Sequence, residues 1–161
     1  IAIWGQKTFV WGPKEIGFVM LLAGLTQILV QGVLLRVLLK YLNEIIIIRS
    51  GYISLILGFF IIPFSNLYFM PIAVILLCYG IGVSNPCLNS LISKNANPDS
   101  RGLAMGSAYS SQAAARFLGQ PLAGLMFLYL GKNYHFYFDV IFLSLLAIFY
   151  FFINLNRTKT L

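Results

Sequence analysis

Three polar side chains inside a largely apolar stretch are the residues whose types and spacing most clearly suggest chemistry. Gln112, Arg116 and Gln120 are four residues apart, so on an α-helix they form one polar stripe. An arginine at the centre of a membrane-spanning helix costs about 2.5 to 3.5 kcal/mol on insertion scales. Such a residue is kept only where an interaction offsets that cost.

Several kinds of group could interact with Arg116 inside the membrane. We expect this side chain to face a water-filled pathway, an anionic group of a substrate, or an acidic residue of a segment outside this chain. The alternative is an arginine bonded to backbone carbonyls where helices pack. Asp139 is the carboxylate inside a predicted span, but its depth differs from that of Arg116 by about 13 Å, so a direct ion pair is not expected.

Two other apolar segments carry amides at helical spacing. Gln27 and Gln31 are one turn apart, with Gly24 one turn earlier, and Asn85 and Asn89 are one turn apart in a later segment. Lipid penalises such groups unless they face a cavity or another helix. We predict that these amides, with Gln112, Arg116 and Gln120, line a substrate pathway. Interhelical hydrogen bonds between the amides are the alternative explanation.

Patterns for catalysis or metal binding are missing from the sequence. It contains no phosphate-binding loop, no nucleophile elbow and no pair of inward carboxylates. Cys78 and Cys87 are nine positions apart in one segment, too far for a disulfide, and neither has a companion at metal-ligand spacing. We therefore expect no enzymatic activity, no catalytic residues, no metal and no cofactor.

The composition indicates that the elements holding these residues lie in lipid. Hydrophobic residues make up 60% of the chain, charged residues 9%, and the mean hydropathy is +0.88. In the hydrocarbon layer every backbone polar group must be paired within its own segment, and long uncharged runs favour helices over barrel strands. The chain carries no charge from Ser50 to Ser93, and the break at Pro63–Asn66 and Pro71 predicts two crossings joined by a tight turn.

The sequence thus predicts an all-α integral membrane protein, a polytopic bundle of five complete transmembrane helices plus the end of a sixth. Ile1–Phe9 is apolar but too short to cross, so it resembles the outer end of a helix whose body is missing. The second span, after Ser54 and Gly58, and the last span, over Phe142–Phe152, are almost wholly aliphatic or aromatic and are expected to face lipid. The five predicted spans are Ile16–Leu35, Ser50–Leu67, Ile72–Ile92, Leu103–Leu130 and Tyr134–Ile153.

Lysine and arginine set the predicted orientation. Successive spans cross the membrane in alternating directions, and the loops on one side of the membrane then hold most of the basic residues. By the positive-inside rule that side is cytoplasmic, and the carboxyl tail lies on it. The net charge of +7 then reflects topology, and we expect no nucleic-acid partner. The predicted cytoplasmic face holds Arg36, Lys40, Arg49, Lys94, Arg101, Arg157 and Lys159, and the outer face holds Lys7, Lys14 and Lys132.

A ridge of small residues lies beside the polar stripe in the fourth span. Small side chains let helix backbones approach closely in lipid, so the ridge predicts a helix packing surface. Pro121, which follows Gly119 and Gln120, removes a backbone hydrogen bond and predicts a kink or loosened turn that would suit a moving gate. The ridge consists of Ser107, Ser111, Ala115, Gly119 and Ala123.

Several short motifs, in their order and spacing, resemble those of a known family. The chain resembles the carboxyl-terminal half of a major facilitator superfamily transporter, in the drug/proton antiporter branch that includes tetracycline-efflux-like proteins. Asn43 stands where that family usually has glycine. The motifs are Trp11–Gly17, Gln31–Gly32 through Arg36 to Leu42–Glu44, Asn97–Gly102 with Gly106, and Gly119–Pro121 with Gly124.

The resemblance implies a helix bundle of major facilitator type, with the five spans as helices 8 to 12 and Ile1–Phe9 as the end of helix 7. The missing partner is then an amino-terminal half of six helices, and the two halves rock about a midplane site. Helices 7, 8, 10 and 11 would line the cavity. The residues implied in cytoplasmic loops and gating are Arg36, Asp99, Arg101, Gly119 and Pro121.

The functional expectation is secondary active transport by alternating access. We expect export of small amphipathic compounds coupled to protons, with the titrating acid in the missing half because no buried carboxylate in this chain suits the role. The partners are then the transported molecule, membrane lipids and the missing half, in the inner or plasma membrane of a bacterium. A metabolite or sugar permease of the same fold, or a membrane remnant or scaffold without transport, is the alternative.

Overall fold

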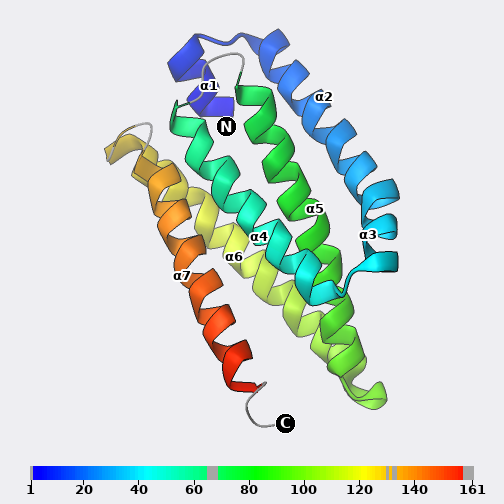
Figure 1. Ribbon diagram of the computed structural model, residues 1–161. Helices are drawn as coiled ribbons and strands as arrows, with labels where there is room; N and C mark the ends of the chain where they lie inside the picture. The colour runs from blue at the N-terminus through cyan, green and yellow to red at the C-terminus, as the bar shows by residue number, and fades with distance from the viewer. Residues whose placement is uncertain (1, 65–68, 130, 132–133, 158–161) are drawn as a thin grey trace.

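The computed structural model describes residues 2–64, 69–129, 131 and 134–157, which form a helical bundle without a strand (Figure 1). The predicted all-α fold class is therefore confirmed. In chain order the elements are α1 (Ala2–Phe9), α2 (Pro13–Leu29), the π-helix η1 (Val30–Leu34), α3 (Leu35–Tyr41), α4 (Glu44–Ile61), the 3-10 helix η2 (Ile62–Phe64), α5 (Met70–Asn95), the 3-10 helix η3 (Pro98–Ser100), α6 (Arg101–Tyr129) and α7 (Tyr134–Arg157).

Each predicted span is a helix that extends beyond its predicted start or end. Among the described residues three helical stretches are both long and apolar enough to cross a membrane, namely Pro13–Tyr41, Glu44–Phe64 and Met70–Asn95. The 29 residues of α6 also suffice in length, but the polar stripe lowers its hydropathy. In α7 the described apolar stretch is Phe136–Ile148. Ser65, Asn66, Leu67, Leu130, Lys132 and Lys159 lie outside the described residues.

Local chemistry explains where α2 begins. Gly12 is the N-cap residue, and its backbone N–H donates to Oε2 of Glu15 at 2.9 Å. Pro13 occupies the first turn, where a missing N–H costs nothing. The preceding Trp11 is buried and stacks on Phe9 with ring centroids 5.3 Å apart. The motif at residues 11–17 therefore both starts a helix and anchors its first turn. We call this end of the bundle the outer end, after its predicted orientation.

A π-helix interrupts this first long span. Residues Val30–Leu34 form η1 between α2 and α3, so the span continues to Tyr41 with one widened turn. Such a turn re-aims the side chains that follow it, and π-bulges occur frequently at functional sites. Nothing in the local composition predicts η1, and it contains the predicted pathway residue Gln31.

Small residues join α4 to α5 along a close seam. A Cβ on Gly80 would lie 2.7 Å from the backbone oxygen of Gly51, so glycine is required at this crossing. Ser84 packs against Gly51 from the α5 side. One turn away, Oγ of Ser54 donates to the backbone oxygen of Leu76 at 2.8 Å. The seam holds the two central helices together through backbone proximity and an interhelical hydrogen bond.

The predicted lipid-facing role of the second span is wrong for one side of α4. Ile47, Ile48, Gly51, Ser54, Leu55 and Gly58 are buried, and α4 packs on both α5 and α7. The other side, with Ile53 and Phe60, is apolar and exposed. In a membrane, apolar residues occur both where a helix packs on another helix and where it faces lipid. Hydropathy therefore did not distinguish the two sides of α4. The small residues Gly51, Ser54 and Gly58 were the available signal.

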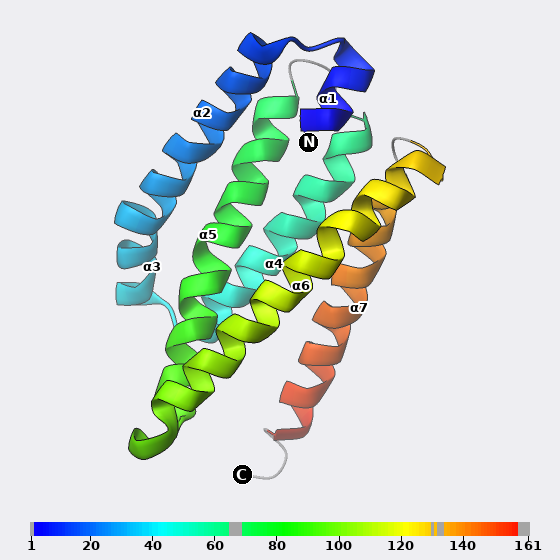
Figure 2. The same cartoon turned by 180° about the vertical axis from the view of Figure 1, so that it is seen from behind.

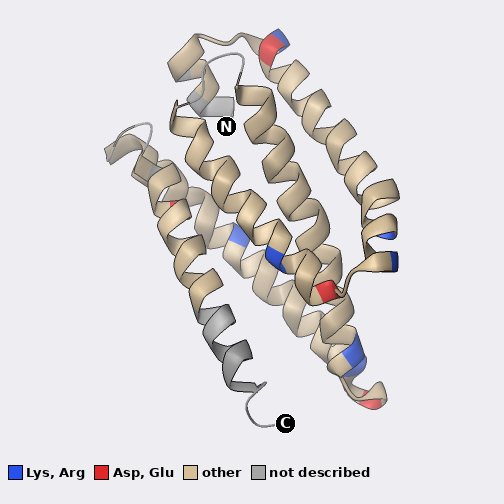
Figure 3. Cartoon of the chain, in the orientation of Figure 1, with Lys and Arg blue, Asp and Glu red and all other residues tan. Residues whose placement is uncertain are grey.

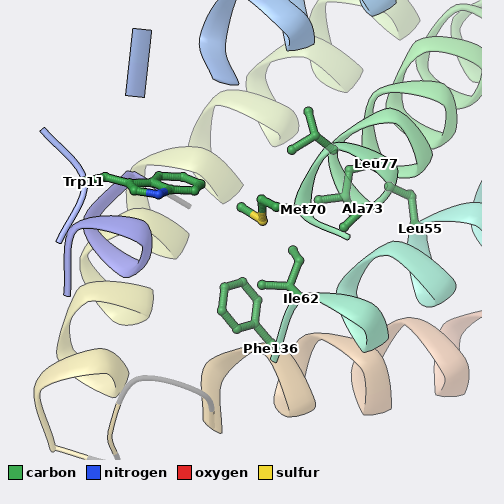
Figure 4. Close-up of a cluster of buried hydrophobic side chains, with 8 residues drawn as sticks. Trp11, Leu55, Ile62, Met70, Ala73, Leu77 and Phe136 are labelled. Carbon is green, nitrogen blue, oxygen red and sulfur yellow. The ribbon is translucent and has the colours of Figure 1, made fainter. Parts of the chain in front are cut away.

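A cluster of buried apolar side chains joins the outer ends of the helices (Figure 4). Ile62 and Met70 lie at its centre and are almost completely buried, between Trp11 and Phe136. The cluster therefore connects the chain before α2, the end of α4, the start of α5 and the start of α7. Its members are Trp11, Leu55, Ile62, Met70, Ala73, Val74, Leu77 and Phe136.

The bundle has two sides. Figure 2 shows α5 between α2 and α6, with α4 and α7 behind α6, and Figure 1 shows the reverse order. The neighbours in this arrangement are also in contact, since α5 packs on α2, α4 and α6, and α7 packs on α4 and α6. One side of the bundle therefore consists of α2, α5 and α6, and the other of α4 and α7.

Candidate functional site

The predicted pathway residues all lie on α2, η1, α5 and α6, the helices of one side of the bundle (Figure 2). Gln27 is half-buried, and its Oε1 is 3.5 Å from the position that a Cβ on Gly82 of α5 would take. Asn85 and Asn89 are half-buried in α5, and Gln31 is exposed on η1. The close approach at Gly82 thus brings the amide of α2 beside α5.

In α6 the polar stripe is open. Gln112 is half-buried, whereas Arg116 and Gln120 are exposed. Leu118 and Leu125 follow Arg116 by two and nine positions, which places them on the opposite side of the helix. The helix therefore presents a polar side and a bulky apolar side, and the apolar side is the one that suits lipid.

Three of the polar residues lie at a similar distance along their own helices. The outer ends of α2, α5 and α6 lie at the same end of the molecule (Figure 1). At 1.5 Å per residue, Gln27, Asn85 and Arg116 are each about 20 Å from the outer end of their helix. The contact of Gly82 with Gln27 and Val30 places Asn85 about one turn further into the bundle than Gln27. We call Gln27, Asn85 and Arg116 the upper layer.

A second set lies one turn further in. Gln31, Asn89 and Gln112 are each about 27 Å from the outer ends of their helices by the same reckoning. We call them the lower layer. Oδ1 of Asn89 is buried and has no hydrogen-bond partner among the residues that the structure describes, so it remains an open acceptor. The third residue of the stripe, Gln120, is about 14 Å from the outer end of α6.

Arg116 and Asp139 do not pair. Neither side chain takes part in an ion pair or hydrogen bond within the described part of the chain, in agreement with their different depths. The carboxylate sits near the outer start of α7, where it is half-buried. Nothing in the described chain therefore balances the charge of Arg116.

The ridge of small residues is also uncovered. Ser107, Ser111, Ala115, Gly119 and Ala123 are all exposed, and a Cβ added at Gly119 would meet nothing within 4 Å. The predicted helix packing at this ridge therefore does not occur among the residues that the structure describes. α6 remains an α-helix through Pro121, so the predicted kink there stays a prediction.

Two described pockets lie away from the polar layers. The one at the outer ends of α2 and α5 has a volume of about 200 Å³ and apolar walls that include Trp11, Phe18 and Met70. The other, at the opposite end, has a volume of about 490 Å³ and is lined partly by Asn43 and Glu44. Neither contains a predicted pathway residue. Among the described residues no group of three His, Cys, Asp or Glu side chains could hold a metal ion.

Most charged residues of the described chain gather at the ends of the helices, and basic ones are more numerous at the end where α3 and α5 finish (Figure 3). The predicted gating residues Arg36, Asp99 and Arg101 are exposed there, in α3, η3 and the start of α6. They form no ion pair with one another in the described part of the chain. A latch would therefore need a partner from elsewhere.

A charged cluster at the same end was not predicted. Oε1 of Glu44, the first residue of α4, accepts a hydrogen bond from Nζ of Lys94 and another from Oγ of Ser90, each at 2.7 Å. Lys94 and Ser90 belong to the last turns of α5. Opposite charges near the adjoining ends of two consecutive antiparallel helices were the available signal. These bonds join α4 to α5 at one end of the contact between the two helices.

We expect Glu44→Gln to lower the free energy of unfolding, because it removes the ion pair with Lys94. The expected loss is only about 0.5 to 1 kcal/mol, since the Lys94 side chain is 67% exposed and water screens the pair. A double-mutant cycle with Lys94→Met, followed by thermal unfolding in detergent, measures the coupling. Adding salt should reduce it. The control is Asp99→Asn, an exposed acid without a partner among the described residues, which should change stability by less than about 0.3 kcal/mol. Equal effects of the two substitutions would contradict the role of the pair.

Comparison with known proteins supplies the family. A family model described as Major Facilitator Superfamily matches residues 1–160, nearly the whole chain. No match was found among curated proteins or among solved structures. The match agrees with the helical bundle and with its long apolar helices. This chain is a member of the Major Facilitator Superfamily, an integral membrane protein of a family whose members are transporters.

Proposed function

We propose that this chain forms the carboxyl-terminal half of a secondary active transporter that works by alternating access. It exports small amphipathic compounds in exchange for protons, as in the drug/proton antiporter branch. The observation that carries the proposal is the pair of polar layers on α2, α5 and α6, in which Gln31 and Arg116 are exposed and the four amides of Gln27, Asn85, Asn89 and Gln112 are only half-buried. Midplane polar groups on facing helices suit a solute that must cross the membrane.

A second half of six helices is the proposed partner, facing the side of the bundle formed by α2, α5 and α6. Support comes from the small residues exposed on that side. A Cβ added at Gly17, Gly24, Gly119 or Gly124 would meet nothing within 4 Å, although small residues in membrane helices commonly mark close helix contacts. The second half would cover this surface and close the pathway between the two lobes.

The proton carrier is proposed to lie in that second half. The chain has four acidic residues, and none is in the middle of α2, α5 or α6. Glu44 is engaged with Lys94, while Glu15 and Asp99 lie near helix ends. The positive-inside rule supports a cytoplasmic carboxyl tail, and the branch resemblance supports the inner or plasma membrane of a bacterium.

The test is a flux assay on the full-length protein in liposomes with an imposed proton gradient. The probes are 7-diethylaminocoumarin-3-carboxylate, its uncharged primary amide and its trimethylammonium derivative, with radiolabelled glucose as a sugar. We expect accumulation of at least one coumarin, lost when an ionophore collapses the gradient. Flux of glucose alone would favour the permease, and no flux of any probe would overturn transport.

Substitution of a lower-layer amide links the assay to the site. We expect Gln31→Leu to reduce coumarin flux about tenfold, because one hydrogen bond to the solute is lost without loss of the helix. Val33→Leu is the matched control, since Val33 is exposed on the opposite side of the same π-helix. It should leave flux within about twofold of the unsubstituted protein. Equal coumarin flux in Gln31→Leu and Val33→Leu would show that Gln31 does not contact the transported solute.

A further inference from the structure

The charge balance of the polar layers points to the class of solute. The upper layer contains one guanidinium and two amides, from Arg116, Gln27 and Asn85. The lower layer, Gln31, Asn89 and Gln112, contains amides and no charge. The six residues therefore carry a formal charge of +1, and no acidic side chain of this chain lies at their depth.

The chemistry of the upper layer matches an oxyanion. A guanidinium presents five N–H donors in a planar fork and accepts nothing, and each amide adds two N–H donors. Carboxylate, phosphate and sulfate groups accept such donors, with paired hydrogen bonds from arginine. A cationic solute would instead meet an uncompensated positive charge in a region of low dielectric constant.

The apolar side chains beside the polar layers suit a solute that has an apolar part as well as an anionic group. Beside the polar layers the exposed surface of α2 and α6 includes apolar side chains such as Met20, Ile28 and Phe117. A solute with one anionic group and an apolar part could place its charge at Arg116 and its remainder along this surface.

We propose that the transported compounds are amphipathic organic anions and that Arg116 binds their anionic group. This inference rests on the proposed function and narrows it to one charge class. Gln27 and Asn85 supply further amide donors from α2 and α5 on the same side of the bundle. The substrate provides the negative charge that the described chain does not provide for Arg116.

The experiment measures binding of two matched probes to the full-length protein in detergent by fluorescence anisotropy. The probes are 7-diethylaminocoumarin-3-carboxylate and its primary amide, which differ mainly in one charge. We expect the carboxylate to bind at least tenfold more tightly than the amide. In Arg116→Gln the two affinities should fall within about twofold of each other, through weaker binding of the carboxylate only. Unchanged binding of the amide shows that the variant is folded.

Two further variants sharpen the result. Arg116→Lys should keep part of the preference for the carboxylate, because the charge remains but the planar fork is lost. Lys14→Gln, which removes an exposed positive charge at the start of α2, should keep the full preference. Loss of the preference in Lys14→Gln would show long-range attraction rather than a site at Arg116, and would overturn the proposal.

The liposome assay separates this inference from the proposed function. If the protein carries the amide or the cationic coumarin as fast as the carboxylate, and Arg116→Gln changes none of these rates, the inference is wrong and transport stands. If carboxylate flux alone falls at least tenfold in Arg116→Gln, the inference is supported.

Discussion

Replacing Gly80 with alanine will destabilise the protein by about 3 kcal/mol, even though alanine is the better helix former. The added Cβ would lie 2.5 Å from Cγ of Leu55 and 2.7 Å from the backbone oxygen of Gly51. The Leu55 side chain could rotate away from the added Cβ. The backbone oxygen of Gly51, however, can move only if α4 and α5 separate. Overpacking of this kind costs about 1 to 3 kcal/mol, and contact with backbone places Gly80→Ala at the upper end.

Helix propensity predicts the opposite sign, which makes the measurement decisive. In the interior of a helix, alanine is favoured over glycine by about 1 kcal/mol. Gly106→Ala in α6 is the matched control, since its Cβ would meet nothing within 4 Å of the described chain. Thermal unfolding of the full-length protein in mild detergent compares the two variants. A Gly80→Ala protein as stable as Gly106→Ala would show that α4 and α5 do not cross closely at this point.

Replacing Ile62 with alanine will cost about 2 kcal/mol of stability. Ile62 has 0% of its surface exposed and lies in the cluster that joins the outer ends of four segments (Figure 4). Removing three of its carbon atoms leaves a cavity between Met70 and Phe136. In soluble proteins Ile→Ala in a core costs about 2 to 5 kcal/mol. We expect the lower end here, because lipid already solvates apolar groups in the unfolded state.

The control for this prediction is Ile53→Ala in α4. Ile53 is 59% exposed on the apolar outer side of that helix, so its truncation changes contact with lipid or detergent and leaves no internal cavity. Heating in the presence of a thiol-reactive dye follows unfolding through Cys87, which is 1% exposed when the chain is folded. The prediction fails if both isoleucine variants unfold at the same temperature.

The elements were predictable because lipid imposes simple requirements on a sequence. Uncharged runs such as Ser50–Ser93 had to form helices, since no water is available to pair with their backbone groups. The polar stripe of Gln112, Arg116 and Gln120 was equally predictable from spacing alone. Sequence also placed these residues in a helix that is confirmed as α6.

The packing role of α4 was not predictable from hydropathy. Ile47 is fully buried and Ile53 is largely exposed in one helix, yet both are isoleucines in an apolar run. In water the exposed position would have been polar, but in lipid both sides of a helix are apolar. Only the glycines and serines of the seam carried information about which side packs.

The sequence by itself determined the membrane helices, the polar residues within them and the family motifs, because each depends on residues close together in the chain. Tertiary structure decided which side of each helix is covered, the bond from Lys94 to Glu44, and the widened turn at Val30–Leu34. It also placed Gln27, Asn85 and Arg116 on one side of the bundle, with Gln27 beside Gly82 of α5. The physical reason is that these features depend on how neighbouring helices are aligned, and that alignment follows from close contacts between residues far apart in the sequence.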